Sequence, residues 1–154
     1  MTAVVIGTPE ALKAFVGEEI AVSDWMEVSQ ERINLFAEAT GDRQWIHLDP
    51  VRAKRESPFG ITIAHGFLTL ACLSHLMQQA VQVHGGTRLA VNYGLNRVRF
   101  PSPVRVGSKI RGHFTLLSIK EIADAHEAVF ACSVECEGSD KPCCAAEWIL
   151  RYYK

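Results

Sequence analysis

The segment from about residue 65 to residue 83 restricts the fold more than any other part of the sequence. Its apolar side chains cover nearly the whole circumference of a helix, and a helix that is apolar on all sides has to be buried. Gly85 and Gly86 end the helical pattern. The residues that form this apolar surface are Phe67, Leu68, Leu70, Ala71, Cys72, Leu73, Leu76, Met77, Ala80 and Val81.

Strands are expected after this helix. Apolar or small residues then occur at every second position, as in the series Ile110, Gly112, Phe114 and Leu116. One buried helix against a large antiparallel sheet is an α+β architecture. A single hot-dog domain, in which the sheet wraps around one long helix, fits this pattern, although periodicity alone does not separate it from other α+β folds. The expected strands are 87–93, 95–101, 108–120, 125–137 and 143–153, with a turn at 138–140 between the last two.

The N-terminal half has weaker signals. Residues 18–23 favour a short strand, and Ser29 is placed to cap a helix over 30–40 that Gly41 ends. Residues 42–64 contain three Pro or Gly residues and are expected to form a loop, with one short helix around 50–55.

Composition excludes several classes of protein. A length of 154 residues corresponds to one domain, 1–154, and the net charge of −1 gives no general attraction to nucleic acid. No run approaches the ~18 apolar residues that a membrane-spanning helix needs. The first six residues are apolar but too short for a secretory signal, and the number of cysteines is odd. We therefore expect a cytoplasmic protein with reduced thiols.

The cysteines raise the alternative of a metal site. They contain no C-x₂-C pair, and Cys143 and Cys144 would point to opposite faces of a strand. Cys132 and Cys136 could share a face, but two ligands do not make a site. We therefore expect neither a metal nor a cofactor.

The loop after the first helix carries the candidate chemistry, because Asp42 is followed by His47. A carboxylate and an imidazole that share one water can exchange protons with it near neutral pH. Positions five apart do not share a helix face, so the two side chains converge only if the chain turns between them. The alternative is that Asp42 only turns the chain and His47 is a core histidine with a hydrogen-bond partner.

Gly66 opens the buried helix and suggests an oxyanion site. Free amides at a helix N-terminus favour developing negative charge. The Gly66 amide could therefore face a thioester carbonyl oxygen as it becomes enolate-like. The alternative is that the glycine only permits close packing of the helix on the sheet.

Taken together, these two segments resemble the MaoC-like, (R)-specific enoyl-CoA hydratase family (hydratase 2), and within it the nodulation-protein-N-like branch. The family pattern is a small residue and Gly-Asp, then Asn-Pro and a His at the same spacing, followed later by Ala/Val-His-Gly and a hydrophobic residue. Here these motifs stand as residues 39–47 and 64–67, and the similarity extends from about residue 25 to the C-terminus. Residues 93–101 and 103–107 resemble the family's strand after the helix.

The resemblance implies a homodimeric hot-dog lyase of fatty acid metabolism that hydrates trans-2-enoyl-CoA to (R)-3-hydroxyacyl-CoA. It gives Asp42 and His47 the roles of the catalytic pair, and Gly66 that of the amide that polarises the thioester carbonyl. Ser74 matches a supporting family serine. Where the family has Asn-Pro, this sequence has Gln44-Trp45, so Gln44 keeps a supporting amide while the proline is lost.

Several questions remain open in the sequence. The CoA phosphates require cations, and the candidates are Arg97, Arg99 and Arg105, with Lys109 and Arg111 nearby, although each also suits a solvated strand face. His65 is interpreted as a structural residue at the helix start. A thioesterase on the same fold is the alternative enzyme, and a non-catalytic acyl-thioester-binding protein is the alternative without chemistry.

Overall fold

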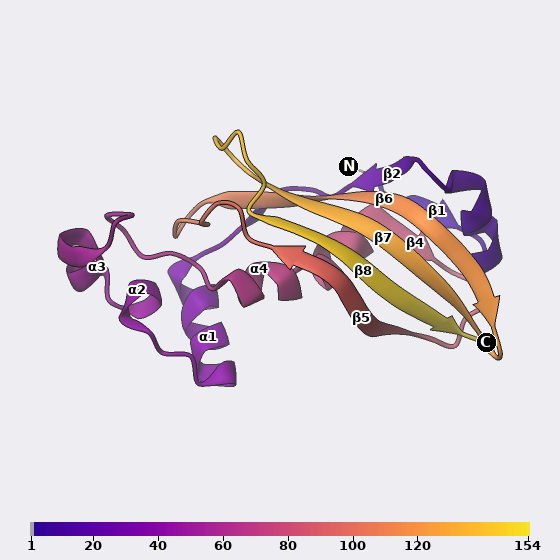
Figure 1. Ribbon diagram of the computed structural model, residues 1–154, viewed down its shortest axis with the longest axis horizontal. Helices are drawn as coiled ribbons and strands as arrows, with labels where there is room; N and C mark the ends of the chain where they lie inside the picture. The colour runs from indigo at the N-terminus through magenta and orange to yellow at the C-terminus, as the bar shows by residue number, and fades with distance from the viewer. Residues whose placement is uncertain (1) are drawn as a thin grey trace.

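A long antiparallel sheet forms most of the molecule (Figure 1). The computed structural model describes residues 2–154. The main sheet contains β2 (Glu19–Val22), β3 (Met26–Glu27), β5 (Leu89–Arg99), β6 (Lys109–Ile122), β7 (Ala125–Cys136) and β8 (Cys144–Tyr153). Its order is β2-β6-β7-β8-β5, with β3 also paired to β6. A second, parallel pair joins β1 (Val4–Ile6) to β4 (Val81–Val83).

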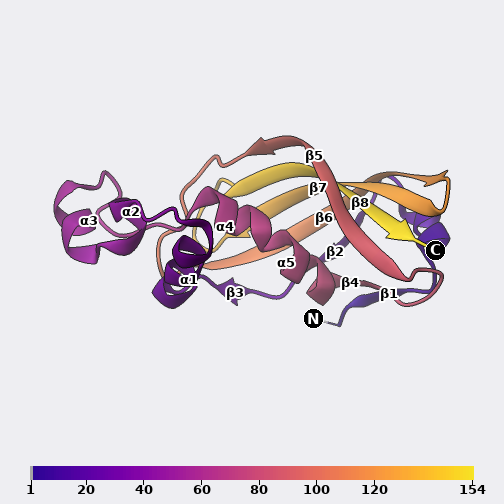
Figure 2. The same ribbon diagram turned by 90° about the horizontal axis from the view of Figure 1, so that it is seen from below.

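Two consecutive helices, α4 (Gly66–Ala71) and α5 (Leu73–Ala80), run along one face of this sheet (Figure 2). They meet at Cys72, which keeps right-handed helical dihedral angles of −68° and −14°. The predicted single helix over 65–83 is therefore divided, and it ends three residues early because Val81–Val83 pairs with Val4–Ile6. Burial on all sides was also wrong, since Phe67 is 68% exposed. The α+β hot-dog architecture itself is confirmed.

The core lies between these helices and the sheet. Phe114 and Phe130 are fully buried there, and truncating such a side chain costs about 3–5 kcal/mol. A Cβ added at Gly112 would lie 2.7 Å from the ring of Phe114 and 3.3 Å from Cβ of Leu76. Gly112 therefore allows the sheet to approach α5 closely.

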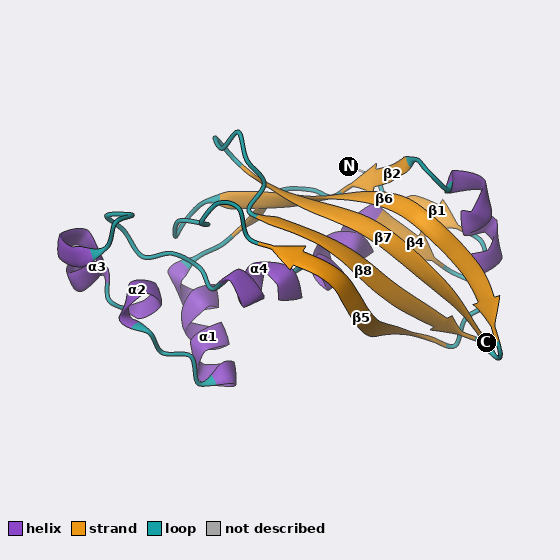
Figure 3. Cartoon of the chain, in the orientation of Figure 1, coloured by secondary structure: helices purple, strands orange, loops and turns teal. Residues whose placement is uncertain are grey.

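The predicted helix 30–40 is confirmed as α1 (Gln30–Thr40). The Ser29 hydroxyl accepts the N–H of Arg32, and Gly41 ends the helix with a left-handed φ of 79°. The short helix expected at 50–55 is α3 (Pro50–Glu56), whereas α2 (Trp45–Leu48) and the 3₁₀ helix η1 (Pro9–Phe15) were not predicted. Helices α1, α2 and α3 gather at one end of the molecule, beyond the start of α4 (Figure 3).

The largest error in the strands concerns Gly94, which was expected to separate 87–93 from 95–101. The chain instead forms the single strand β5, and its pairing with β8 absorbs the extra residues as irregularities between Asn92 and Gly94 and between Leu95 and Arg97. Across residues 2–154, every helix falls short of the length and apolar content required to cross a bilayer.

Candidate active site

Asp42 stands directly after the turn that ends α1. Gly41 reverses the chain there, and the Asp42 Oδ1 then accepts a weak hydrogen bond from the N–H of Gln44 at 3.4 Å. This local bond orients the carboxylate while the residue stays exposed. The exposed carboxylate is available to a substrate or a water molecule.

His47 lies on α2 and is 6% exposed. Its Nδ1 is 2.7 Å from the carbonyl oxygen of Ile63. Because a carbonyl can only accept, Nδ1 carries the hydrogen and Nε2 of the neutral ring keeps a free lone pair. Burial lowers the pKa of His47 and outweighs the effect of the Ile63 carbonyl, which raises it, while His65 also lowers it and Asp42 raises it. His47 is therefore a neutral base near pH 7.

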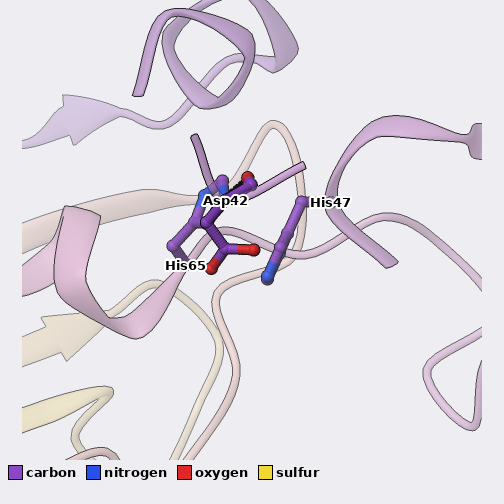
Figure 4. Close-up of side chains that lie close together, drawn as sticks. All are labelled: Asp42, His47 and His65. Carbon is purple, nitrogen blue, oxygen red and sulfur yellow. Dashed lines mark hydrogen bonds between the residues drawn. The ribbon is translucent and has the colours of Figure 1, made fainter. Parts of the chain in front are cut away.

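His65 completes the cluster. Its ring stacks on that of His47, with centroids 3.8 Å apart and planes inclined by 24°. The carboxylate of Asp42 points toward His47 beside it (Figure 4), and one polar atom from each of the three residues lies within 4.8 Å of the others. The turn required by the five-residue spacing is present, so the pair predicted from sequence does converge.

This cluster has the residue types of a metal site, but its geometry suits one poorly. A ring nitrogen binds a metal in the plane of its ring. Two stacked imidazoles have nearly parallel planes, so they cannot both direct a lone pair at one ion without rotating. We therefore interpret the cluster as a place for a water molecule and a substrate.

Gly66 is the first residue of α4, directly after His65. The amides of the first helical turn have no acceptor within the helix, so the Gly66 N–H is available to a ligand. A cleft of about 440 Å³ opens beside it, and its lining includes Ile63, Thr69 and Phe100. Gly66 therefore lines this cleft, and it directly follows His65, which belongs to the cluster with Asp42 and His47.

Residues 12–135 match the protein family described as MaoC like domain. The chain belongs to the MaoC-like family. The family predicted from sequence is confirmed, and with it the enzyme class, a hydro-lyase.

Two MaoC-like relatives align with most of this chain. This chain is 52% identical over 142 residues to 3-hydroxyacyl-thioester dehydratase Z of Mycobacterium tuberculosis. The aligned region covers 92% of this chain and 93% of that protein. The chain is 45% identical over 139 residues to nodulation protein N of Rhizobium meliloti, covering 90% of this chain and 86% of the relative. A monoamine oxidase regulatory protein from an Archaeoglobus species has the same fold, with a TM-score of 0.77 at 22% identity over 100% of this chain and 99% of that one.

Gln44 and Trp45 replace the Asn-Pro of the MaoC-like pattern without disrupting the turn. Trp45 is the first residue of α2, where proline is favoured, and Gln44 keeps extended dihedral angles of −58° and 137°. The guanidinium of Arg52 lies 4.3 Å above the Trp45 ring. Gln44 contributes its backbone to the turn and is exposed, so a supporting role for its side chain stays a prediction.

Ser74 lies on α5, about 12 Å along the helix axis from Gly66. Its hydroxyl accepts a hydrogen bond from Asn92 Nδ2 at 3.3 Å. Within residues 2–154 it contacts neither Asp42 nor His47, so its supporting role also stays a prediction. Ser74 instead lines a groove between α5 and β5.

The three arginines proposed for CoA phosphates lie near the same end of the molecule as Gly66. Arg97 and Arg99 are in the last part of β5, which ends just before Phe100. The backbone of Arg105 forms an isolated β-bridge with Ile63. All three are exposed, and none forms an ion pair with another residue of the described chain. Arg111 is not free to bind a phosphate, because it forms an ion pair with Glu135 at 2.6 Å.

Two residues of the site were not found from sequence. Gln30 donates through Nε2 to the His47 carbonyl at 2.7 Å, and its Oε1 accepts the hydroxyl of Thr62 at 2.7 Å. Gln30 thus connects α1 to the segment that carries His47 and to the segment that leads into α4. Nothing in the sequence marks Gln30 or Thr62, because the contacts join residues 17 and 32 positions apart.

Proposed function

We propose that this protein adds water to trans-2-enoyl-CoA to form (R)-3-hydroxyacyl-CoA and catalyses the reverse dehydration. One observation carries the proposal: the Asp42 carboxylate and the His47 imidazole meet at His65, and Gly66 begins α4 directly after His65. The relative named 3-hydroxyacyl-thioester dehydratase Z supports the same chemistry at 52% identity.

In the hydration direction, one water would lie between Asp42 and His47. The carboxylate accepts a hydrogen bond from this water and orients it. The Nε2 of His47 has a free lone pair, because Nδ1 donates to Ile63, and it accepts the other hydrogen as the water oxygen bonds to the β-carbon. The imidazolium then gives that proton to the α-carbon, so one molecule of water is added in total.

The thioester carbonyl requires a donor, because its oxygen gains negative charge as the β-carbon is attacked. The Gly66 N–H at the start of α4 meets this need, and loss of one such donor typically reduces kcat by about 10²–10³-fold. The short helix alone would be a weak anion site. Its position directly after His65 is what brings the amide to the proton-transfer groups.

The acyl chain would follow α4 and α5 away from Gly66. Leu70 and Ser74 succeed Gly66 at intervals of four residues and therefore share its side of the helix. Both line a groove against β5 and Trp148, which continues past Ser74 into a cavity of about 720 Å³. At the other end, Arg97, Arg99 and Arg105 would bind the CoA phosphates.

We also propose a homodimer formed through β5. This strand is at the edge of the sheet, and it exposes four large apolar side chains, namely Leu89, Val91, Tyr93 and Leu95. A long, exposed, apolar edge strand invites pairing with another chain. A second copy is the occupant we favour, since two β5 edges could pair antiparallel and continue the sheet.

The state of the cysteines supports a location in a reducing compartment. All five cysteines are free and buried. We therefore propose a cytoplasmic location, which fractionation of the producing cells would test.

Crotonyl-CoA and longer trans-2-enoyl-CoA esters are the substrates for the decisive assay. Hydration removes the absorbance of the conjugated enoyl thioester, and chiral chromatography of the product gives its configuration. A thiol reagent run in parallel detects free CoA. Loss of enoyl absorbance without thiol release supports the proposal, thiol release would identify a thioesterase, and tight binding without turnover would identify a binding protein.

A further inference from the structure

His65 touches both members of the catalytic pair. Its Nε2 lies 2.9 Å from the backbone carbonyl oxygen of Asp42, and its ring stacks on His47 at 3.8 Å. The side chain is 3% exposed, and Phe36 covers it at a centroid distance of 5.0 Å. One buried ring therefore connects two residues that come from different turns of the chain.

The hydrogen bond to Asp42 determines the tautomer of the neutral His65 ring. The Asp42 carbonyl can only accept, so Nε2 of His65 carries the hydrogen and Nδ1 carries the lone pair. That Nδ1 is buried and has no hydrogen-bond partner within the described chain. Buried polar atoms are normally satisfied, so an unsatisfied one beside the proposed site requires an explanation.

The N-cap position of α4 does not explain why residue 65 is a histidine. The residue occupies the N-cap of α4, where Ser, Thr, Asp or Asn would satisfy the free amides. The His65 side chain makes no capping hydrogen bond. It turns away from the helix and toward the loop that holds Asp42. The Gly66 amide is therefore left available to a ligand.

We infer that His65 is the positioning residue of this site, which holds the Asp42 backbone by a hydrogen bond and the His47 ring by stacking so that both face one water. This inference rests on the proposed hydratase function. His65 does not touch the substrate in this arrangement; it acts through its two neighbours.

The stacking also affects proton transfer. The titratable groups that face His47 are Asp42 and His65, and His65 lowers the pKa of His47 in addition to the effect of burial. The His65 ring covers one face of His47 and shields it from water. Removing the ring therefore exposes His47 and raises its pKa toward the ordinary value.

Three variants separate the two contacts. His65→Gln keeps an N–H donor for the Asp42 carbonyl and loses the stacked ring. His65→Phe keeps a stacked ring and loses the donor. His65→Ala loses both. His75→Ala is the matched control, because His75 is an exposed histidine of α5 that contacts Gln79.

We expect His65→Ala to lower kcat by about 10²-fold, the typical effect of misplacing a catalytic group by about 1 Å, with little change in KM. His65→Gln and His65→Phe should each retain part of the activity. The acid limb of the pH–kcat profile should move to higher pH in His65→Ala and His65→Gln, and less in His65→Phe. NMR titration of the His47 ring should show the same order without substrate.

The outcomes are distinct. Wild-type kcat and an unshifted His47 titration in a folded His65→Ala or His65→Gln protein would overturn the positioning role, as would a loss of thermal stability with no movement of the acid limb. If wild-type protein fails to hydrate any enoyl-CoA, the proposed function fails instead, and the NMR titration still decides whether His65 controls His47.

Discussion

The ring of Phe100 lies against the α-carbon of Gly66, in the space that a side chain at residue 66 would need. A Cβ built there would meet a ring carbon of Phe100 at 2.9 Å. Gly66 also supplies the proposed oxyanion donor. Its two roles, steric and chemical, can be separated with a pair of substitutions.

Gly66→Ala adds the Cβ and keeps the N–H, whereas Gly66→Pro adds it and removes the N–H. Proline suits the first helical position, and His65 already has the extended dihedral angles, −59° and 136°, that precede proline. Both variants should lose about 1–3 kcal/mol of stability through crowding against Phe100. Gly66→Pro should lose a further factor of about 10²–10³ in kcat. Equal kcat values in the two variants would exclude the Gly66 amide as the oxyanion donor.

Asp42→Asn should lower kcat for crotonyl-CoA hydration by about 10²–10⁴-fold, because the neutral amide loses the negative charge that orients the water and stabilises the imidazolium formed at His47. Asp42 is exposed, so thermal denaturation should show a change within about 0.5 kcal/mol. Asp49→Asn is the control, since Asp49 is a nearby carboxylate that caps α3 through the N–H of Arg52. An Asp42→Asn protein as active as Asp49→Asn would remove Asp42 from the mechanism.

The lowered pKa of His47 predicts a dependence of stability on pH. The unfolded chain binds a proton at His47 near its ordinary pKa of 6.5, and the folded protein binds it only at lower pH. The unfolded state therefore holds more protons in that interval, and the free energy of unfolding decreases as the pH falls below 6.5. This contribution is fully present at higher pH.

The difference in unfolding free energy between wild type and His47→Gln should therefore change between pH 7.5 and pH 5, with wild type losing more stability on the acid side. Urea denaturation at a series of pH values measures it. His75→Gln serves as the control for removing an exposed histidine. Parallel pH curves for wild type and His47→Gln would show that the folded and unfolded pKa values are equal.

Val91→Lys should prevent assembly through β5. Val91 is 41% exposed on the edge strand, and a lysine there opposes edge-to-edge pairing. Light scattering should show a dimer for wild type and a monomer for the variant. Val5→Lys, at an exposed valine of β1 in the smaller sheet, should stay dimeric. A dimeric Val91→Lys protein would place the interface elsewhere.

Ser74→Leu should reduce activity on substrates with long acyl chains. The added side chain would narrow the groove between α5 and β5 while leaving the residues around Gly66 in place. We expect kcat/KM to fall steeply for long enoyl-CoA chains and little for crotonyl-CoA. An unchanged dependence on chain length would show that the acyl chain follows another path.

Local signals were enough to predict α1 from the sequence. Ser29 and Gly41 act within one turn of the helix ends, so a single chain segment contains the information. The end of α5 was misplaced because Val81–Val83 is extended by pairing with Val4–Ile6, a contact far away in the sequence. Gly94 failed as a strand boundary for a similar reason, since β8 pairs with the chain on both sides of it.

The site shows the same division. Asp42, His47 and Gly66 could be proposed from the sequence because a motif with fixed spacing carries them. His65 was interpreted as structural, and its contact with the Asp42 carbonyl depends on a chain reversal that brings together residues 23 positions apart. Gln30 lies at the start of a well-predicted helix, yet only the folded arrangement shows that it supports His47.

The segment that contains α2 and α3 extends beyond the end of the sheet (Figure 1), while most core residues lie between α4, α5 and the strands. Substitutions at exposed positions of this segment, such as Gln44, can therefore alter reactivity while the folding free energy, which depends mainly on the buried core, is little affected. The replacement of Asn-Pro by Gln44-Trp45 is a change of this kind. The exposed positions of the projecting segment are therefore the natural starting point for directed evolution.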